Sequence, residues 1–401
     1  MKSFLFLLFT ILFLVSCGIA KPLQYKPKKI DNHPLKLAVF LDGTSNNART
    51  YTNVFKLYNL VSLQNNPNIS AQYQRGVGNG ADILGKIMGS GIKREVCKAY
   101  LYLAENYQYQ RNDEIYIFGF SRGAYTSRVL AGFIFTAGII EIEKIPKEKR
   151  LKYIKKVFDA HKGKNKTLQQ RRDAVYEITQ QKINPAVYKI AFMGLWDTVS
   201  AIGSPKYDEE YYSPNNGYVD QLCNVKKVSQ ALSLNDSRSA IFTPVMLSHS
   251  GLTVNCKKVN PNDIANEVWF FGAHSDVGGG YTNTHISGVS LNWMLKELKG
   301  YNLLPINSSV YENRLDITNN PSPGIAKLLF SNKNRKLSRL ASLNGYKKDK
   351  LKIHRSVLDR LEISLKSFEI NLIKIFSECF EKNDKGGYTY KKESNCFRII
   401  D

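Results

Sequence analysis

A serine lies between two glycines in Gly119-Phe120-Ser121-Arg122-Gly123, a G-x-S-x-G pattern that follows the apolar run IYIF and precedes the helical pattern AYTSRVLAGFIF. Where a strand turns sharply into a helix, this pattern holds a serine nucleophile on a strained backbone, and glycines on either side avoid steric clashes. The backbone N–H of Arg122, at the start of the helix, is the expected first donor to an oxyanion. The alternative is a tight turn in which Ser121 only caps the helix. We expect Ser121 to be a nucleophile.

A serine hydroxyl needs a base, and the base needs an orienting carboxylate. Among six histidines, His274 stands out because it follows the apolar run VWFFGA and precedes a turn that contains three consecutive glycines. Asp197 ends another apolar run, in GLWDTV, while Asp276 competes for the role of orienting acid because it lies two residues from His274. The order Ser121, Asp197, His274 is the order found in α/β-hydrolases. The sequence therefore predicts these three as a catalytic triad, with Asp276 holding the loop.

A second oxyanion donor is expected from the loop Asp42-Gly43-Thr44, through the backbone N–H of Gly43 or Thr44. Asp-Gly-Thr also occurs in haloacid-dehalogenase phosphatases, but their pattern needs an aspartate two residues earlier, where this chain has Phe40. The phosphatase hypothesis therefore lacks its nucleophile. We expect no metal and no organic cofactor, because serine chemistry needs neither and the cysteines show no metal-binding spacing.

Four apolar runs end abruptly in turn residues, and helical patterns lie between them. The runs are Leu35–Thr44, Asp113–Gly123, Val187–Thr198 and Asn266–Gly280, and the helical patterns are Arg94–Tyr107, Arg122–Gly138 and Ser290–Lys299. Continuous apolar strands alternating with helices predict an α/β fold with a mostly parallel sheet and helices on both faces. Ligands of such sheets bind at the carboxyl ends of the strands, where the candidate residues lie.

The N-terminus has the layout of a signal peptide. One lysine precedes an apolar stretch that is short for a membrane-spanning helix and ends at Cys17. Leu14-Val15-Ser16-Cys17 resembles the lipobox of bacterial lipoproteins, in which the cysteine becomes the lipidated first residue; the alternative is an ordinary secretory signal. Gly18 is not the aspartate associated with inner-membrane retention in enteric bacteria. We expect a protein of the bacterial cell envelope that is lipid-anchored through Cys17. The sequence favours the outer membrane, on the side that faces the periplasm.

The expected organisation has three parts after the signal peptide, residues 1–16. A basic tether is followed by the catalytic domain, which carries a Lys-rich helical insertion that is a candidate lid, and then by a basic, helical C-terminal region. Their bounds are 17–35 for the tether, 36–300 for the catalytic domain, 141–185 for the insertion and 301–401 for the C-terminal region.

Charge and cysteine content restrict the function classes. With 57 Lys and Arg against 34 Asp and Glu, the formal charge is +23, which suits an anionic membrane surface or nucleic acid. No zinc finger or RNA-binding motif accompanies the charge, so no nucleic-acid partner is expected. A single apolar stretch of near-spanning length excludes a multi-span transporter. The cysteines after Cys17 are odd in number, which leaves one thiol outside any intramolecular bridge; Cys223–Cys256 and Cys379–Cys396 are possible pairs.

Several segments together resemble the DUF2235 family, whose best-known members are phospholipase effectors of the type VI secretion system. They are FLDGTSNN, TNVFKLYNL, QRGVGNG, IYIFGFSRGAYTSRVLAGFI, FMGLWDTVSAIG, VWFFGAHSDVGGGY and HRSVLDRL, which span about residues 36–361. The resemblance implies an α/β-hydrolase fold, with the triad roles on Ser121, Asp197 and His274. It also implies a serine esterase whose substrate is a phospholipid or another lipid ester, with phospholipase A-type activity.

The chain also departs from that family. Ser45 follows Asp-Gly-Thr where a tryptophan is frequent, and YTNTHISGVSLNW follows Gly280 where many members have an acidic loop. Type VI cargo normally has no export signal, so a lipobox favours a role on the producer's own envelope. The alternative function is a lipid-anchored, non-catalytic protein that binds a lipid or a partner; the sequence identifies no protein partner.

Overall fold

The structure is a computed structural model. The residues that it describes are 21–27, 33–76, 91–163, 165–182, 184, 187–199, 221–238, 242, 244–247, 256, 259, 261–282, 285–321, 335, 351–363, 372–373 and 376–401.

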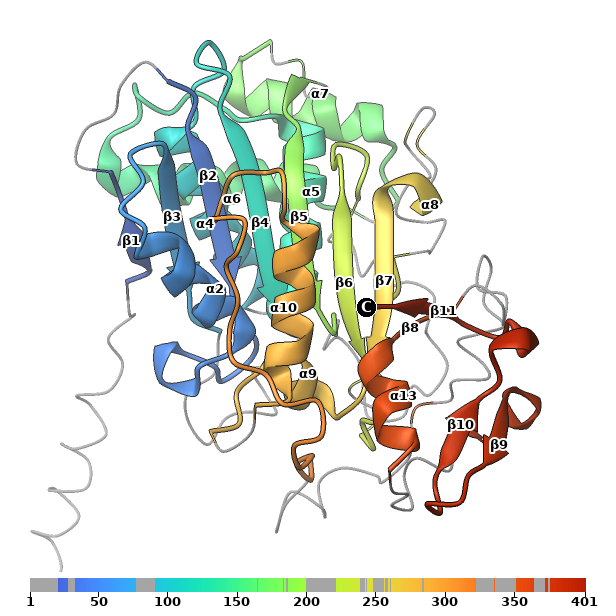
Figure 1. The fold of residues 1–401 in the computed structure, drawn as a ribbon. Coiled ribbons are helices and arrows are strands. Elements are labelled where there is room, and N and C mark those ends of the chain that lie inside the picture. Colours follow the sequence, from blue (N-terminus) through green and yellow to red (C-terminus); the bar gives the residue numbers. More distant parts are fainter. Residues whose placement is uncertain are drawn as a thin grey trace, which may run out of the picture.

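A nine-stranded sheet runs through the described part of the chain, in the order β1-β3-β2-β4-β5-β6-β7-β8-β11 (Figure 1). Every neighbouring pair is parallel except β1 with β3. The strands are β1 (Leu23–Tyr25), β2 (Lys36–Leu41), β3 (Ile69–Gln74), β4 (Glu114–Phe120), β5 (Ile190–Trp196), β6 (Val228–Ser233), β7 (Ala265–Phe270), β8 (Lys352–His354) and β11 (Arg398–Ile400). A separate hairpin consists of β9 (Phe380–Lys382) and β10 (Tyr388–Tyr390).

Helices cover both faces of the sheet (Figure 1). One face carries α4 (Ile92–Asn106) and α5 (Arg122–Ala137), on which α6 (Lys147–His161) and α7 (Leu168–Thr179) pack. The other face carries α2 (Asn53–Ser62) and α10 (Ser287–Glu297). The short elements are η1 (Ala48–Thr50), α8 (Pro261–Ile264), α9 (His274–Gly278), α13 (Arg355–Leu361), η5 (Ser377–Cys379) and η6 (Lys392–Ser394).

Strand β2 shows why the central strands are continuously apolar. Leu37, Val39 and Leu41 belong to the core beneath α4 and α5, whereas Ala38 and Phe40 belong to the core beneath α2 and α10. Successive side chains of a strand point to opposite faces, so a strand covered on both faces needs apolar residues at every position. This confirms the expected mostly parallel sheet with helices on both faces.

The expected strands correspond to β2, β4, β5 and β7, and the expected helices to α4, α5 and α10. The sequence did not indicate β3 or β6. The tether, residues 17–35, includes β1, which pairs antiparallel with β3 at the sheet edge. The insertion, residues 141–185, forms α6 and α7, which contact α4 and α5; its role as a lid stays a prediction.

The C-terminal region differs from the helical region that we expected for residues 301–401. Its described part contains α13, but β8 and β11 extend the main sheet beyond β7, and β9 and β10 form a hairpin. These strands have three residues each, too few for a strand pattern to be recognised in the sequence. The sheet therefore continues past residue 300.

Two disulfides join Cys223 to Cys256 and Cys379 to Cys396, and Cys97 is a buried free thiol. These are the two pairs that the sequence left open. In the described residues, the helices are all too short or too polar to cross a bilayer. Cys17 and the predicted signal peptide lie outside the described residues.

Candidate active site

The candidate residues follow four neighbouring strands at their carboxyl ends. Ser121 follows β4, Asp197 follows β5, and His274 comes shortly after β7. Strand β6, which lies between β5 and β7, leads to a further carboxylate, Asp236. All four are buried, with exposed fractions of 7% for Ser121, 3% for His274 and 0% for each aspartate.

Ser121 occupies a sharp turn from β4 into α5. Its φ of 58° and ψ of −125° lie in a region that residues with a side chain seldom adopt, as a nucleophile elbow requires. A β-carbon at Gly119 would crowd Ala124 and Ser127 of α5, and one at Gly123 would overlap the carbonyl oxygen of Leu41. The glycines of the motif therefore let strand, turn and helix approach closely.

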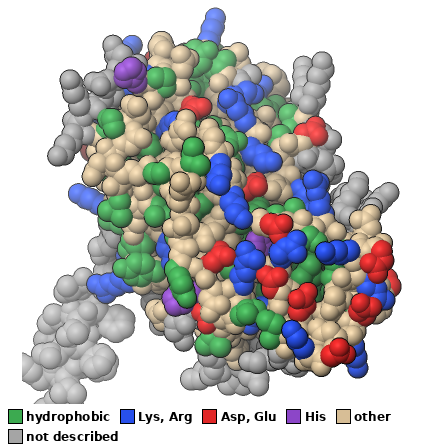
Figure 2. Space-filling model, viewed as in Figure 1, with side chains coloured by type: hydrophobic (Ala, Val, Ile, Leu, Met, Phe, Trp, Pro, Cys, Tyr) green, Lys and Arg blue, Asp and Glu red, His purple; other side chains and the backbone are tan. Residues whose placement is uncertain are grey.

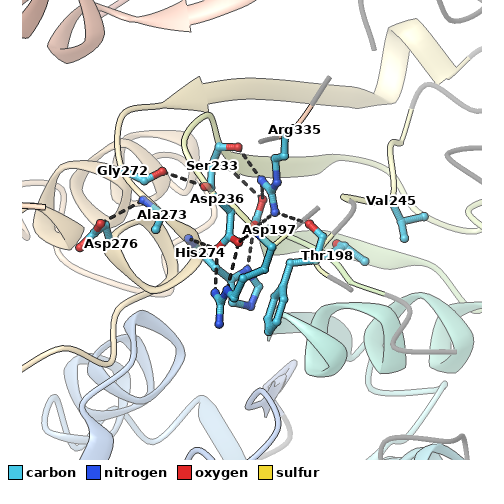
Figure 3. A network of polar contacts seen from close by, with 12 residues as sticks. Asp197, Thr198, Ser233, Asp236, Val245, Gly272, Ala273, His274, Asp276 and Arg335 are labelled. Atoms are coloured by element: carbon cyan, nitrogen blue, oxygen red, sulfur yellow. Dashed lines mark hydrogen bonds and ion pairs between the residues drawn. The ribbon is translucent and has the colours of Figure 1, made fainter. Parts of the chain in front are cut away.

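His274 and Asp197 form the central contact of the site. Nδ1 of His274 lies 2.5 Å from Oδ2 of Asp197, and both side chains are buried (Figure 3). Asp197 has a left-handed φ of 40°, which turns the chain as it leaves β5. A hydrogen bond at Nδ1 fixes the neutral ring in the tautomer whose Nε2 can accept a proton.

Asp197 has a second charged partner that the sequence did not reveal. Nη1 of Arg335 lies 2.8 Å from Oδ1 of Asp197, and Nη2 lies 2.7 Å from Oδ2. Arg335 also donates to the carbonyl oxygens of Ser233 and Phe242. The backbone N–H of Ser233 donates to Oδ1 of Asp197 at 3.0 Å. Both oxygens of the carboxylate are thus held in place (Figure 3).

A second ion pair supports the start of α9. Asp236 Oδ2 accepts from the backbone N–H of His274 at 3.1 Å and pairs with Arg238 Nη2 at 2.7 Å. The guanidinium of Arg238 lies 3.7 Å from the ring centroid of Phe242, and that ring contacts the imidazole of His274 edge-on at 4.8 Å. The imidazole is therefore fixed at its backbone and on one side of its ring.

Burial and charge set the protonation states. Burial would raise the pKa of Asp197, but the Arg335 guanidinium and the hydrogen bonds from His274 and Arg335 hold it well below its usual range. Burial lowers the pKa of His274 from its ordinary value, although the hydrogen bond and charge of Asp197 partly oppose this effect. At neutral pH the pair is therefore an ionised carboxylate and a neutral imidazole.

Neighbouring groups link the serine turn to the Asp–His pair, and among the described residues there is no hydrogen bond between Ser121 and Nε2 of His274. The ring of Phe120 lies 4.6 Å from the ring of His274, and the backbone N–H of Ser121 donates to the carbonyl of Trp196 at 2.9 Å. In the described part of the chain, Nε2 of His274 is buried and has no hydrogen-bond partner. Hydrogen bonds between a base and a nucleophile are often long in a free enzyme and tighten when substrate binds.

The Asp42-Gly43-Thr44 loop lies beside the elbow. A β-carbon on Gly43 would come within 2.9 Å of Cβ of Ser121. The backbone N–H of Gly43 donates to Oδ1 of Asp42 at 2.8 Å, while Oδ2 of Asp42 accepts from Tyr73 and Thr52. Burial raises the pKa of Asp42 to about 6, although these hydrogen bonds oppose the shift. Since the Gly43 amide is engaged, the candidate second oxyanion donor in this loop is the Thr44 amide.

Asp276, the competing acid, contacts other groups. Its Oδ2 accepts from the backbone N–H of Ala273 at 2.9 Å, and its Oδ1 accepts from Asn319 Nδ2 at 2.9 Å. It holds the start of α9.

In the described residues, the one group with the spacing of a metal site is Glu378 with Cys379 and Cys396. The sulfurs of these two cysteines are joined in a disulfide.

Sheet, elbow and Asp–His pair together define an α/β-hydrolase fold, with the side chains in the chain order of that class. The protein belongs to the family described as type VI secretion system phospholipase effector Tle1-like, catalytic domain, whose family profile matches residues 36–297. This confirms the resemblance found in the sequence.

Individual proteins similar to this chain share low sequence identity with it or match only part of it. A 183-residue stretch is 31% identical to an uncharacterized protein of Saccharomyces cerevisiae and covers 40% of this chain and 26% of the yeast protein. A crystal structure of an uncharacterized protein from Pseudomonas aeruginosa is 16% identical, with a TM-score of 0.38, over 66% of this chain and 45% of that chain. A Tle1 effector bound to the VgrG spike of the type VI secretion system is 21% identical, with a TM-score of 0.35, over 64% of this chain and 52% of that chain. The chain thus matches about half of each solved relative and about a quarter of the yeast protein.

Proposed function

We propose that the protein is a serine hydrolase that cleaves acyl esters of lipids, with Ser121 as nucleophile, His274 as base and Asp197 as orienting acid. The observation that carries this proposal is the 2.5 Å contact between His274 Nδ1 and Asp197 Oδ2 beside the strained elbow of Ser121. A protein that only binds a lipid has no need of an oriented imidazole.

The reaction has two halves. Ser121 Oγ bonds to the acyl carbonyl carbon while Nε2 of His274 takes the hydroxyl proton. The bond from that carbon to the alcohol oxygen then breaks, and His274 passes the proton to the leaving alcohol. A water molecule, deprotonated by His274, attacks the acyl-enzyme, and Ser121 leaves with the proton as the fatty acid is released.

The oxyanion is assigned to backbone donors. Arg122 is the first residue of α5, so its N–H points out of the positive end of the helix dipole. The Thr44 amide is the proposed second donor, because its loop lies against the elbow and the Gly43 amide already donates to Asp42. Removing one donor from such a site costs on the order of 10²–10³ in kcat.

The proposed substrate is a phospholipid at an anionic membrane surface, cleaved as a phospholipase A cleaves it. Membership of a phospholipase effector family supports the lipid class. The net charge of +23 supports an anionic surface, at about 1 kcal/mol per cation close to the membrane. On the face seen in Figure 2, basic side chains are scattered, and over the C-terminal region they mix with acidic ones. Helix α6 adds the exposed Lys147, Lys149, Lys152 and Lys156.

We also propose attachment to the bacterial envelope through Cys17. The lipobox-like sequence motivates this, and two disulfides are consistent with an oxidising compartment outside the cytoplasm. A protein placed there would act on lipids of its own cell surface or of a neighbouring cell.

The test is product analysis on vesicles of mixed anionic and zwitterionic phospholipids. We expect mass spectrometry to detect free fatty acid and lysophospholipid with the wild-type protein, and neither with a folded Ser121→Ala variant. Diacylglycerol or phosphatidic acid would show cleavage on the head-group side and contradict the proposal. Vesicle binding without any product would favour the lipid-anchored binding protein instead.

A further inference from the structure

Arg335 lies outside the segment that the family profile matches, which ends at residue 297. Its side chain is nevertheless fully buried and meets both oxygens of Asp197, at 2.8 and 2.7 Å. A planar guanidinium that contacts a carboxylate at two points fixes its orientation more tightly than a single-point ammonium would. The backbone oxygens of Ser233 and Phe242 anchor the guanidinium in turn.

Two ion pairs, Asp197 with Arg335 and Asp236 with Arg238, lie around His274. Asp197 and Asp236 supply two negative charges, and Arg335 and Arg238 supply two positive charges. Asp197 comes from the end of β5, Asp236 and Arg238 from the segment after β6, and Arg335 from the C-terminal region. Ser121, on the β4–α5 turn, adds no charge. A neutral imidazole therefore sees no net charge in this group, and an imidazolium is not favoured by an unpaired carboxylate.

We propose that Arg335 is a positioning residue of the active site, which holds the Asp197 carboxylate in the orientation that meets Nδ1 of His274 and balances its charge. The inference rests on the proposed triad and adds a residue that the C-terminal region supplies. It also means that the region after the catalytic domain is a part of the site.

The role has two separable components. The positive charge opposes protonation of His274, so its loss raises the pKa of the histidine and moves the acid limb of kcat/KM to higher pH. The two-point geometry keeps the carboxylate aligned, so its loss lowers kcat even when a cation remains. Arg335→Met removes both components, and Arg335→Lys removes mainly the geometry.

The test compares full-length wild type with Arg335→Met and Arg335→Lys on a soluble short-chain ester. We expect Arg335→Met to lose about 10²-fold in kcat and to move the acid limb up by about one pH unit. Arg335→Lys should lose about tenfold in kcat, as a partly misaligned site would, with its acid limb near that of the wild type. Arg171→Met is the matched control, because Arg171 is a buried guanidinium on α7 that donates to Gly163; its acid limb should not move.

Proton NMR of the His274–Asp197 hydrogen bond gives a second readout that needs no turnover. Its pH titration reports protonation of His274, and we expect the midpoint to rise in Arg335→Met. If Arg335→Met does not fold, the loss in kcat of Arg335→Lys and its altered NMR signal decide the question. If the folded variants have the same kcat, acid limb and NMR titration as the wild type, the inference on Arg335 is overturned and the proposed function is not. No ester turnover by the wild type would instead overturn the proposed function.

Discussion

The backbone N–H of Ser121 donates a 2.9 Å hydrogen bond to the carbonyl of Trp196, the residue before Asp197. The backbone N–H of Val199, two residues after Asp197, donates to the carbonyl of Ser121 at 3.3 Å. The turn that carries the serine and the turn that carries the aspartate are therefore tied to each other on both sides of Asp197. Small shifts in either turn would change the geometry of both, which makes the site sensitive to packing around it.

Asp197→Asn should lower kcat by on the order of 10⁴, because an amide no longer selects the required histidine tautomer. The matched control is Asp276→Asn, since within the described chain Asp276 hydrogen-bonds to Ala273 and Asn319 and not to the His274 ring. We expect that control to lose far less activity. Steady-state kinetics on both folded variants decide the matter; a larger loss in Asp276→Asn would assign the acid role to Asp276.

The pH dependence follows from the depressed pKa of His274. Because His274, the proposed base, must be neutral to accept a proton, we expect the acid limb of kcat/KM to lie below about 6.5, the ordinary histidine pKa. Because this pKa is lowered only in the folded protein, the unfolded chain binds the proton more tightly than the folded protein does. The stability that the neutral, buried imidazole contributes is therefore lost as pH falls below the ordinary histidine pKa and through the folded one. Rates from acidic to mildly alkaline pH, with circular dichroism at each pH, test this. An acid limb above the ordinary value would contradict the depressed pKa.

Gly278→Ala should damage catalysis without contacting Ser121 or Asp197. A β-carbon at Gly278 would overlap the ring of Phe120, and that ring packs on His274 at 4.6 Å. Displacing the ring should move the imidazole, at a cost of about 10²-fold in kcat for a shift near 1 Å. Gly300→Ala is the control, because a β-carbon there meets no atom, although its φ of 92° costs some stability. Equal kcat in the two variants would show that Phe120 does not position His274.

The sequence indicated the strands that are continuously apolar but not β3 and β6. Strand β6, VSQALS, is completely buried although half of its residues are polar. Gln230 meets its hydrogen-bond needs through Glu267 and the carbonyl of Val245, and Ser233 through the carbonyl of Gly272. These partners lie 15 to 39 residues away in the chain. Local hydrophobic patterns carry no information on such partners, so the strand reads as a polar segment.

The site also contains residues that the sequence indicates and residues that it does not. Ser121, Asp197 and His274 could be predicted because each follows an apolar run, and the structure brings Asp197 and His274 into contact. Asp236 would have been a candidate had β6 been recognised, since it follows that strand as Asp197 follows β5. Arg335 had no signal, because it is one cation within a basic stretch that reads as solvated surface. Only the fold reveals which cation is buried against the carboxylate.

The most direct test of the account is covalent labelling with a fluorophosphonate, which reacts with an activated serine. We expect the wild-type protein to be labelled at Ser121, as located by peptide mass spectrometry, and Ser127→Ala to be labelled like the wild type, because Ser127 is a buried serine of α5 that donates to Gly123. Ser121→Ala should not react, and His274→Ala should react far more slowly. Absence of labelling in folded wild-type protein, or unchanged labelling after loss of His274, would contradict the claim that His274 activates Ser121.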